Sequence, residues 1–273
     1  MVKDKIYHFA DFNLEALLSL SEQLRGRKCT CDVTKMPNCG SLNWVVFVTF
    51  DDGIEWVFRS PMASRNSIYS DETSSKIVNS EASALMYLKA HTSISVPEVY
   101  SYRQVPDNSI GVPYILQSKA AGRSLGSYDW SNCPHRFTGS RNPRPPLPIS
   151  DDGRNKVMHQ LGSIMAELSD YRFAKIGQFL VETIPHLISG FESSFTLSHP
   201  DLHVGNIYVD DDLNITCIID WSSTSTGPIA ELLATPGLGG SARPPSESLT
   251  TAFRASFGQR STRIGLELSR SKL

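Results

Sequence analysis

The sequence has no long hydrophobic run. Its first twenty residues, MVKDKIYHFADFNLEALLSL, carry acids at Asp4, Asp11 and Glu15 and have no long apolar core. Such a stretch is neither a secretory signal nor an Arg-rich transit peptide. No segment elsewhere approaches the ~20 apolar residues that a membrane-spanning helix needs. We therefore expect a soluble, cytoplasmic protein without a membrane partner.

An excess of one charge sign is also missing. Lys and Arg total 26 and Asp and Glu total 28, so the formal net charge is −2. Without a basic excess, the composition favours neither nucleic acid nor an anionic membrane as a partner. The 273 residues suffice for one large domain or for two lobes that share a core. Nothing in the sequence predicts the oligomeric state.

Cysteines are few and show no pairing pattern. The five are Cys29, Cys31, Cys39, Cys133 and Cys217. An odd number at these spacings matches no disulfide framework, so reduced thiols in an intracellular protein are expected. The closeness of the first three in sequence raises the question of a zinc site. The paired C-x-x-C spacing is missing, however, and this argues against zinc.

The first part of the chain combines helical periodicity with strand-like runs. Two apolar runs, WVVFVTF and IEWVF, flank Asp51-Asp52-Gly53, and a D-G turn between two such runs is a strong β-hairpin signal. Residues 61–75 are polar and rich in serine, which predicts a loop. The expected elements are a helix over 11–25 capped by Asp11 or Asn13, a helix over 76–91, and strands over 44–50, 54–58, 97–102 and 113–117. They predict a small mixed α/β lobe over residues 1–117.

The sequence after residue 117 has a different pattern, with a long loop followed by helices and short strands. Residues 129–154 are rich in proline and predict a loop. Helical periodicity predicts helices over 156–168 and 179–191, and apolar runs predict two short strands over 207–209 and 215–219 with a turn at 210–214. We expect a catalytic lobe over 118–235. Residues 236–273 open with a stretch rich in Gly, Ser and Pro, and we expect a poorly ordered tail there.

Three polar residues cluster around the second predicted hairpin. Asp201 lies on a loop because Pro200 and Gly205 disfavour a helix there. Asn206 immediately precedes one strand, and Asp220 follows the other. Phosphoryl transfer needs such a set, because Mg²⁺ prefers oxygen ligands and a carboxylate must orient the attacking hydroxyl.

This segment carries a family resemblance. H-x-D-x-x-x-x-N followed by a short hairpin and I-I-D-W resembles the catalytic loop and metal-binding Asp of the aminoglycoside phosphotransferase and choline-kinase-like superfamily, and its wording is most similar to fungal members. His199, Asp201 and Asn206 match the loop, and Asp220 matches the metal-binding position. The resemblance implies an α+β, bilobal protein-kinase-like fold that uses ATP and Mg²⁺, with Asp201 and His199 in the catalytic loop and Asn206 and Asp220 as metal ligands.

The resemblance also implies a nucleotide site. The residues that it assigns there are Gly40, Ser41 and Asn43 in a turn before the hairpin, Arg59 at the strand position that reaches the phosphates, Glu81 on the following helix, and Gln117 and Lys119 beside the adenine. Arg keeps its charge and offers a fork of donors to phosphate oxygens. The turn is not a G-x-G-x-x-G motif and would be weak alone.

The resemblance is incomplete toward the C-terminus. Members of the family continue after I-I-D-W with several helices, whereas this chain runs into its Gly/Ser/Pro-rich stretch, so we expect a truncated, mainly helical lobe. A shortened or altered gene model and a loss of activity are both open explanations. The leading hypothesis is an ATP-dependent phosphotransferase that moves the γ-phosphate to a hydroxyl of an unidentified small-molecule acceptor. The alternative is a non-catalytic, pseudokinase-like module that binds nucleotide or a partner.

Other interpretations of single residues remain open at this point. His199 and His203 form H-x-x-x-H, which binds zinc when both side chains lie on one helical face. Pro200 disfavours that helix, so His199 is expected to buttress the loop. Arg59 could be a surface strand residue, Glu81 a solvated helix acid, and Asp220 a helix cap.

Overall fold

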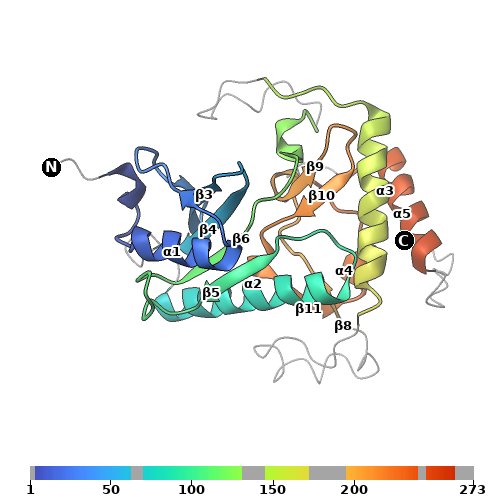
Figure 1. Ribbon diagram of the computed structural model, residues 1–273. Helices are drawn as coiled ribbons and strands as arrows, with labels where there is room; N and C mark the ends of the chain where they lie inside the picture. Colours follow the sequence, from blue (N-terminus) through green and yellow to red (C-terminus); the bar gives the residue numbers. More distant parts are fainter. Residues whose placement is uncertain (1–3, 63–69, 131–144, 172–194, 239–243, 262–273) are drawn as a thin grey trace. The chain divides into compact units, whose positions relative to one another are not determined.

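The computed structural model describes residues 4–62, 70–130, 145–171, 195–238 and 244–261 (Figure 1). The chain divides into two units. The first comprises Met1–His91 and Val96–Lys119, and the second comprises Thr92–Ser95 and Ala120–Leu273. In the described ranges no helix is both long and apolar enough to pass through a bilayer.

The first unit is built on an antiparallel sheet of six strands. Its order is β1-β3-β4-β6-β5, with β2 beside β3. The strands are β1 (Cys29–Thr30), β2 (Asn38–Cys39), β3 (Asn43–Phe50), β4 (Glu55–Pro61), β5 (Val99–Arg103) and β6 (Tyr114–Ser118). The helices are the 3₁₀ turn η1 (Lys5–Tyr7), α1 (Leu14–Arg25) and α2 (Asp71–His91).

The predicted hairpin is present. Strands β3 and β4 pair antiparallel, and Thr49 lies opposite Glu55 beside the turn. Gly53 in the turn has a φ of 81°, a backbone conformation that glycine adopts without the steric cost of a side chain. Burial alternates along both strands, which is the pattern of a sheet with one face in the core.

Aromatic residues fill the core of the first unit. The ring of Phe58 stacks against Tyr114 and Phe12 at centroid distances of 5.3 and 5.8 Å, and Trp44 and Phe58 are almost fully buried. Helix α1 begins at its cap Asn13, whose side chain accepts a hydrogen bond from the backbone N–H of residue 16. Asn13, rather than Asp11, is therefore the cap.

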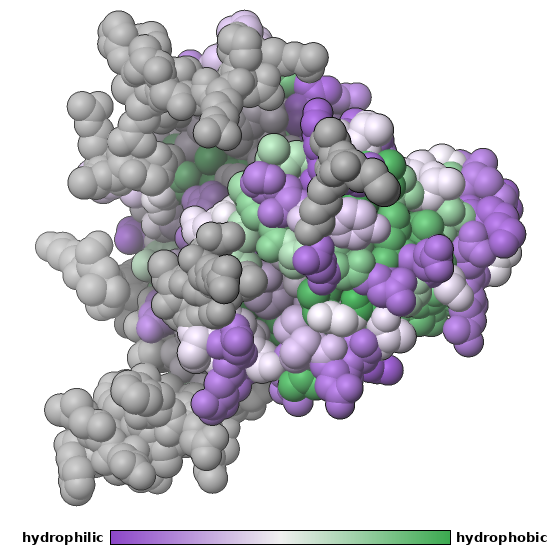
Figure 2. Space-filling view, turned by 90° about the vertical axis from the view of Figure 1, so that its left-hand side faces the viewer, coloured by the Kyte–Doolittle hydropathy of each residue, from purple (hydrophilic) through white to green (hydrophobic). Residues whose placement is uncertain are grey.

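The large hydrophobic side chains that remain exposed are scattered. Those of the described residues are Leu24, Met36, Ile54, Met86 and Val105. Figure 2 shows hydrophilic and hydrophobic side chains interspersed over one face of the molecule. Single exposed apolar residues are ordinary on protein surfaces and do not by themselves mark an interface.

Helix α2 is longer than the sequence predicts. It begins at Asp71 rather than at residue 76, which corrects the expected loop for residues 71–75. Ser70 accepts a hydrogen bond from the N–H of Thr73 through its hydroxyl, and Asp71 and Glu72 lie in the first turn, where the helix dipole favours negative charge. This capping signal was present in the sequence but was masked by the run of serines around it.

The second unit contains two small antiparallel sheets and three α-helices in its described part. One sheet has the order β10-β9-β7 and the other pairs β11 with β8. The strands are β7 (Arg123–Ser124), β8 (Phe195–Ser198), β9 (Ile207–Val209), β10 (Ile215–Ile218) and β11 (Ser225–Pro228). The helices are α3 (Asp151–Leu168), α4 (Ala230–Leu233) and α5 (Glu247–Ser261), with 3₁₀ turns η2 (Leu125–Ser127), η3 (Val204–Asn206) and η4 (Trp221–Ser223).

Helix α3 also starts early, at Asp151 rather than at residue 156. Its cap is Ser150, whose hydroxyl accepts a hydrogen bond from the N–H of Gly153 at 3.1 Å. Asp151 and Asp152 in the first turn again favour this start. The expected loop is thus corrected for residues 151–154, and the helix expected over 179–191 lies outside the described residues.

Helix α5 corrects the expectation of a poorly ordered tail for residues 247–261. It lies alongside α3 (Figure 1) and buries Phe253 and Phe257. A Cβ atom placed on Gly162 of α3 would lie 2.2 Å from the carbonyl oxygen of Phe253. The two helices approach this closely because position 162 has no side chain.

Candidate active site

A rigid turn supports the hairpin that carries the predicted site. The carboxylate of Asp210 accepts hydrogen bonds from the N–H of Asp212 and from the N–H and side-chain amide of Asn214. The Asn214 side chain and backbone are the main groups that lower the pKa of Asp210. This turn joins β9 to β10, so it fixes the strand that follows Asn206 relative to the strand that precedes Asp220.

Asn206 is buried at the end of η3, immediately before β9. Its side-chain Nδ2 donates to the carbonyl oxygen of Asp201 at 2.9 Å. Its own carbonyl oxygen accepts from the N–H of Ile219, also at 2.9 Å. Because the amide nitrogen is held by Asp201, the amide oxygen Oδ1 is the atom that remains for a cation.

Asp220 stands one residue beyond Ile219 in a left-handed backbone conformation, with φ 64° and ψ 56°. Asp tolerates this region better than most residues. Its Oδ1 accepts a hydrogen bond from the Ser222 hydroxyl at 2.8 Å. Asp220 occupies the N-cap position of the short turn η4, as the helix-cap interpretation expects, but its side chain makes no capping hydrogen bond there.

Asp201 faces solvent. Its side chain is 58% exposed, and its Oδ2 lies 3.9 Å from Nε2 of His203, which is too long for a hydrogen bond. Nδ1 of His203 accepts from the N–H of Gly205 at 2.9 Å, so in the neutral ring the proton is on Nε2. The Asp201 carboxylate is therefore accessible to a molecule that approaches from solvent.

His199 has the opposite environment. It is buried, its Nε2 lies 2.9 Å from the carbonyl oxygen of Ile219, and its ring packs edge-on against Trp221. Its Nδ1 has no hydrogen-bond partner in the part of the chain that the structure describes. Burial lowers the pKa of His199. A neutral His199 thus donates from Nε2 to the carbonyl oxygen of Ile219, and this hydrogen bond stabilises the loop that contains Asp201.

The lowered pKa of His199 has a measurable consequence for stability. Below the ordinary value of 6.5, the unfolded chain takes up a proton that the native state resists. The free energy of unfolding should therefore fall with acidification through this window, by at most about 1.4 kcal/mol per pH unit for one proton. Urea unfolding at several pH values between 7.5 and 5 should show a smaller loss for His199→Gln than for wild type.

The matched control for this experiment is His159→Gln. His159 is exposed on α3, and its replacement should leave the pH dependence of wild type unchanged. Identical pH slopes in wild type and His199→Gln would mean that the buried ring does not resist protonation.

The His and Cys side chains considered for zinc do not form one cluster in the described ranges. In the described ranges no three His, Cys, Asp or Glu side chains lie close enough together to bind a metal. His199 hydrogen-bonds to the backbone of Ile219, and His203 hydrogen-bonds to the backbone of Gly205. Cys29, Cys31, Cys39 and Cys217 form no disulfide among the described residues, and burial raises the pKa of Cys31 to about 12.

In the first unit the structure brings Arg59 and Glu81 together. Nη1 of Arg59 on β4 donates to Oε1 of Glu81 on α2. The two side chains are 11% and 3% exposed, so the surface and solvated-helix interpretations of these residues are wrong. The carboxylate of Glu81 thus fixes the position of the buried Arg59 guanidinium.

Breaking this pair should be costly for the fold. In Arg59→Ala the Glu81 carboxylate remains buried without its partner, which should destabilise the protein by about 3–5 kcal/mol in urea unfolding. The double variant Arg59→Ala/Glu81→Ala removes the unpaired charge and should recover part of the loss.

A surface pair provides the comparison. Lys119 donates to Glu55 at 2.5 Å, and the side chains are 47% and 33% exposed. Lys119→Ala should cost no more than about 1 kcal/mol. If the Arg59 and Lys119 variants lost equal stability, burial would not be what makes the first pair important.

The other residues assigned to the nucleotide have mixed surroundings. The N–H of Gly40 donates to the carbonyl oxygen of Asn43, which closes the turn around Ser41. A Cβ atom on Gly40 would meet nothing within 4 Å, so the described fold does not itself require glycine there. Gln117 is buried, and its Oε1 has no hydrogen-bond partner in the described part of the chain. Lys119 is occupied by Glu55.

One residue of the site was not anticipated from the sequence. The backbone of Ile219 binds both Asn206 and His199, so it links the loop to the strand that leads to Asp220. Backbone groups leave no trace in residue type. The only signal in the sequence was the apolar run before Asp220. On the other side of Asp220, Trp221 is fully buried, and its indole N–H donates to the carbonyl oxygen of Ile218.

A comparison with known protein families identifies the family of this chain. Residues 37–235 match the family described as "Phosphotransferase enzyme family". The chain belongs to this family. The predicted superfamily is thereby confirmed, and the matched range includes Arg59 and Glu81 as well as the loop and hairpin of the second unit.

Relatives and solved structures add the fold. A subtelomeric hrmA-associated cluster protein of Aspergillus fumigatus is 25% identical over 146 residues, which are 54% of this chain and 24% of that protein. The chain thus spans about a quarter of that relative. An aminoglycoside-3′-phosphotransferase of type VIII is similar with a TM-score of 0.53, 15% identity and 93% coverage of both chains. The amicoumacin kinase hAmiN has a TM-score of 0.52 and 13% identity, over 90% of this chain and 77% of that one. These likenesses confirm the predicted α+β kinase-like fold.

Proposed function

We propose that this protein is an ATP-dependent phosphotransferase that moves the γ-phosphate to a hydroxyl group of a small-molecule acceptor. One observation carries the proposal. The Asn206 side chain is oriented by the backbone of Asp201, and the Asn206 backbone is hydrogen-bonded to Ile219, the residue before Asp220. An amide oxygen and a carboxylate are thus fixed on one hairpin, next to the exposed carboxylate of Asp201.

The donor set fits magnesium. Mg²⁺ prefers oxygen ligands and usually keeps several waters or phosphate oxygens in addition to one or two protein groups. Asn206 Oδ1 and the Asp220 carboxylate are ligands of this kind, and Ser222 holds one oxygen of that carboxylate in place. When bound there, Mg²⁺ would neutralise charge on the ATP phosphates.

Asp201 would orient the acceptor hydroxyl and accept its proton. Its exposure allows an acceptor to reach it, while its backbone oxygen keeps Asn206 in place. The transition state of phosphoryl transfer is loose, so positioning and charge neutralisation contribute more than the strength of the base. The buried, neutral His199 acts on this chemistry only by holding Ile219.

The first unit would bind the nucleotide. Arg59, whose position is fixed by Glu81, would place its positive charge near the phosphate oxygens, and the turn at Gly40, Ser41 and Asn43 would cover the phosphates. The amide oxygen of Gln117 would accept a hydrogen bond from the adenine, since it is buried and has no partner in the described part of the chain. Lys119 would have to leave Glu55 to join this site. The amicoumacin kinase structure contains AMP-PNP and Ca²⁺, a nucleotide analogue and a divalent metal.

The alternative is a pseudokinase-like module that binds nucleotide or a partner without turnover. It rested on the apparent lack of helices beyond the second hairpin. Helix α5 is one such helix and packs closely on α3. The argument for a non-catalytic module from missing helices is therefore weaker. Binding and turnover must be measured separately to decide between the two functions.

The test has two arms. Calorimetry with AMP-PNP, with and without Mg²⁺, measures nucleotide binding, and ADP release in the presence of aminoglycosides, amino alcohols and sugars measures turnover. Acceptor-dependent ADP release by wild type but not by Asp201→Asn supports a phosphotransferase. Magnesium-dependent binding without turnover favours the binding module. A protein that does neither would overturn the proposal.

A further inference from the structure

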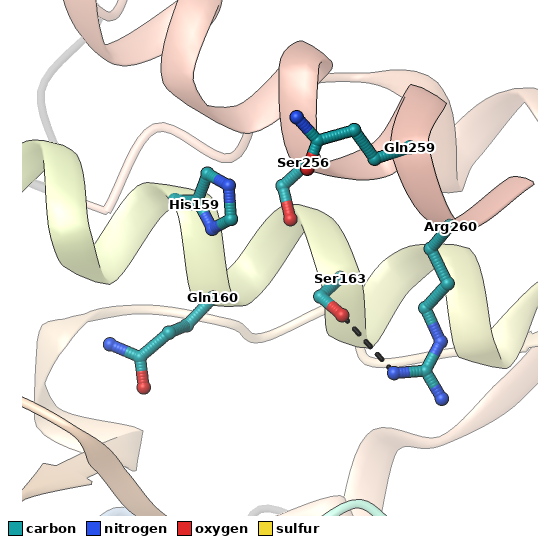
Figure 3. Close-up of a pocket in the computed structure, with 6 residues that line it drawn as sticks. All are labelled: His159, Gln160, Ser163, Ser256, Gln259 and Arg260. Atoms are coloured by element: carbon teal, nitrogen blue, oxygen red, sulfur yellow. Dashed lines mark hydrogen bonds between the residues drawn. The ribbon is translucent and has the colours of Figure 1, made fainter.

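Helix α5 is joined to the rest of its unit by a buried carboxylate. Glu167 on α3 is 5% exposed and accepts hydrogen bonds from the N–H and hydroxyl of Ser93 and from Nη2 of Arg260, the last at 2.7 Å. The other guanidinium nitrogen of Arg260 donates to Ser163 at 3.1 Å (Figure 3). A carboxylate removed from water needs such donors, and Arg260 is its cationic partner.

The contact continues from Ser93 toward the candidate active site. Ser93 lies in the short segment Thr92–Ser95, which belongs to the second unit. The carbonyl oxygen of Ser95 in this segment accepts from the N–H of Ile218 at 2.9 Å. Ile218 ends β10, and the next residue is Ile219, the residue bound by Asn206 and His199.

Helix α3 is thereby linked to both ends of β10, directly at the start of the strand and through the 92–95 segment at its end. Near the start of the strand, Oε1 of Gln160 accepts from the N–H of Ile215 and its Nε2 donates to the carbonyl oxygen of Leu213. At the end of the strand, the path runs from Glu167 through Ser93 and Ser95. The Gln160 side chain on α3 makes the contact at the start of β10 directly. The contact at the end of β10 depends on the position of the Glu167 side chain.

Packing alone does not hold Glu167. The space between α3 and α5 is an open groove of about 490 Å³ lined by His159, Gln160, Ser163, Ser256, Gln259 and Arg260 (Figure 3). A second hollow lined in part by Ser93, Glu167 and Arg260 lies next to it. Water in these spaces is an alternative partner for the carboxylate. Nη2 of Arg260 binds Oε2 of Glu167, the same oxygen that accepts from the Ser93 hydroxyl, so Arg260 holds the carboxylate where Ser93 reaches it.

We infer that Arg260 is a positioning residue for the metal ligands Asn206 and Asp220. It acts through Glu167, the 92–95 segment and β10, and it contacts neither nucleotide nor acceptor. The metal-binding consequence rests on the proposed phosphotransferase function, whereas the ordering of the segment does not. Helix α5 thus contributes to the active site although it lies on the other side of α3.

The experiment compares Arg260→Gln with Arg254→Gln in the full-length protein. Arg254 is exposed on the same helix and is the matched control. Hydrogen exchange of the nucleotide-free protein should be faster in peptides covering 92–96 and 215–221 for Arg260→Gln only. The Mg²⁺ concentration needed for half-maximal AMP-PNP binding should rise about 10-fold or more, the range seen when a group that supports a metal ligand is lost.

Two further variants keep the outcome interpretable if Arg260→Gln folds poorly. Arg260→Lys keeps the charge and should give intermediate exchange and intermediate Mg²⁺ demand. The double variant Glu167→Gln/Arg260→Gln should be no worse than Arg260→Gln, because both residues act in one path.

Failure of the inference about Arg260 and failure of the proposed function give different experimental results. Equal exchange in the Arg260→Gln and Arg254→Gln proteins at both peptides, with at most a lower melting temperature for the former, would overturn the inference. A wild-type protein that does not bind AMP-PNP with Mg²⁺ would overturn the proposed function instead, and the exchange data would still decide whether Arg260 orders β10.

Discussion

Asp220→Ala is expected to abolish magnesium-dependent nucleotide binding together with turnover. The carboxylate is the one charged group of the proposed ligand pair, and Asn206 supplies only a neutral oxygen. Loss of a supporting group around a metal typically costs ~10–100-fold in affinity, so loss of the ligand itself should cost at least about 100-fold. Calorimetric titration of AMP-PNP with and without Mg²⁺ measures this directly.

The backbone at position 220 requires a second variant. Alanine in the left-handed region costs about 1–2 kcal/mol, so part of any effect of Asp220→Ala could come from the loop. Asp220→Asn tolerates this conformation and can still accept from Ser222, yet it lacks the charge. Both variants should lose the magnesium dependence. If Asp220→Asn retained it, charge at this position would not be needed.

Asp201→Asn should have a different signature. It should lower kcat by about 10²–10⁴, the usual contribution of a positioned proton acceptor, and leave nucleotide affinity nearly unchanged. The reason is that Asp201 holds Asn206 through its backbone oxygen, which the substitution preserves. Steady-state kinetics with an acceptor that the enzyme phosphorylates measures kcat, and calorimetry measures the nucleotide affinity.

Asp211→Asn is the control for surface charge, because Asp211 is an exposed acid on the turn of the same hairpin. It should retain wild-type kcat. Equal residual activity in wild type, Asp201→Asn and Asp220→Ala would identify the signal as contamination, and the binding module would then be the better description.

The fold was predictable where the sequence pattern was local. The D-G turn between two β-branched runs correctly gave the hairpin of β3 and β4, because turn chemistry and alternation agree within a few residues. The starts of α2 and α3 were missed because serine-rich and proline-rich surroundings hid the caps Ser70 and Ser150. Helix α5 was missed because Phe253 and Phe257 form a coherent face only against Gly162 of α3, and such tertiary contacts override local propensity.

The site divides in the same way. The spacing of His199, Asp201, Asn206 and Asp220 predicted that these residues lie around one hairpin, because turn residues and apolar strand runs mark loop and strand ends in the sequence. The contacts that orient these residues could not be predicted from the sequence. Ile219 acts through its backbone, and Glu167 and Arg260 lie far apart along the chain, so neither leaves a local pattern.

The close contact between Gly162 and Phe253 has a consequence for synthesis in the cell. Helix α3 is complete when residue 168 has been added, but its partner α5 begins only at residue 247. At the usual rate of about 5–20 residues per second, the ribosome needs roughly 4–16 seconds for the intervening stretch. During this time the side of α3 that α5 will cover remains exposed. We therefore expect nascent chains of this protein to be bound by chaperones that recognise exposed apolar helices, and we expect the second unit to reach its native packing after the first.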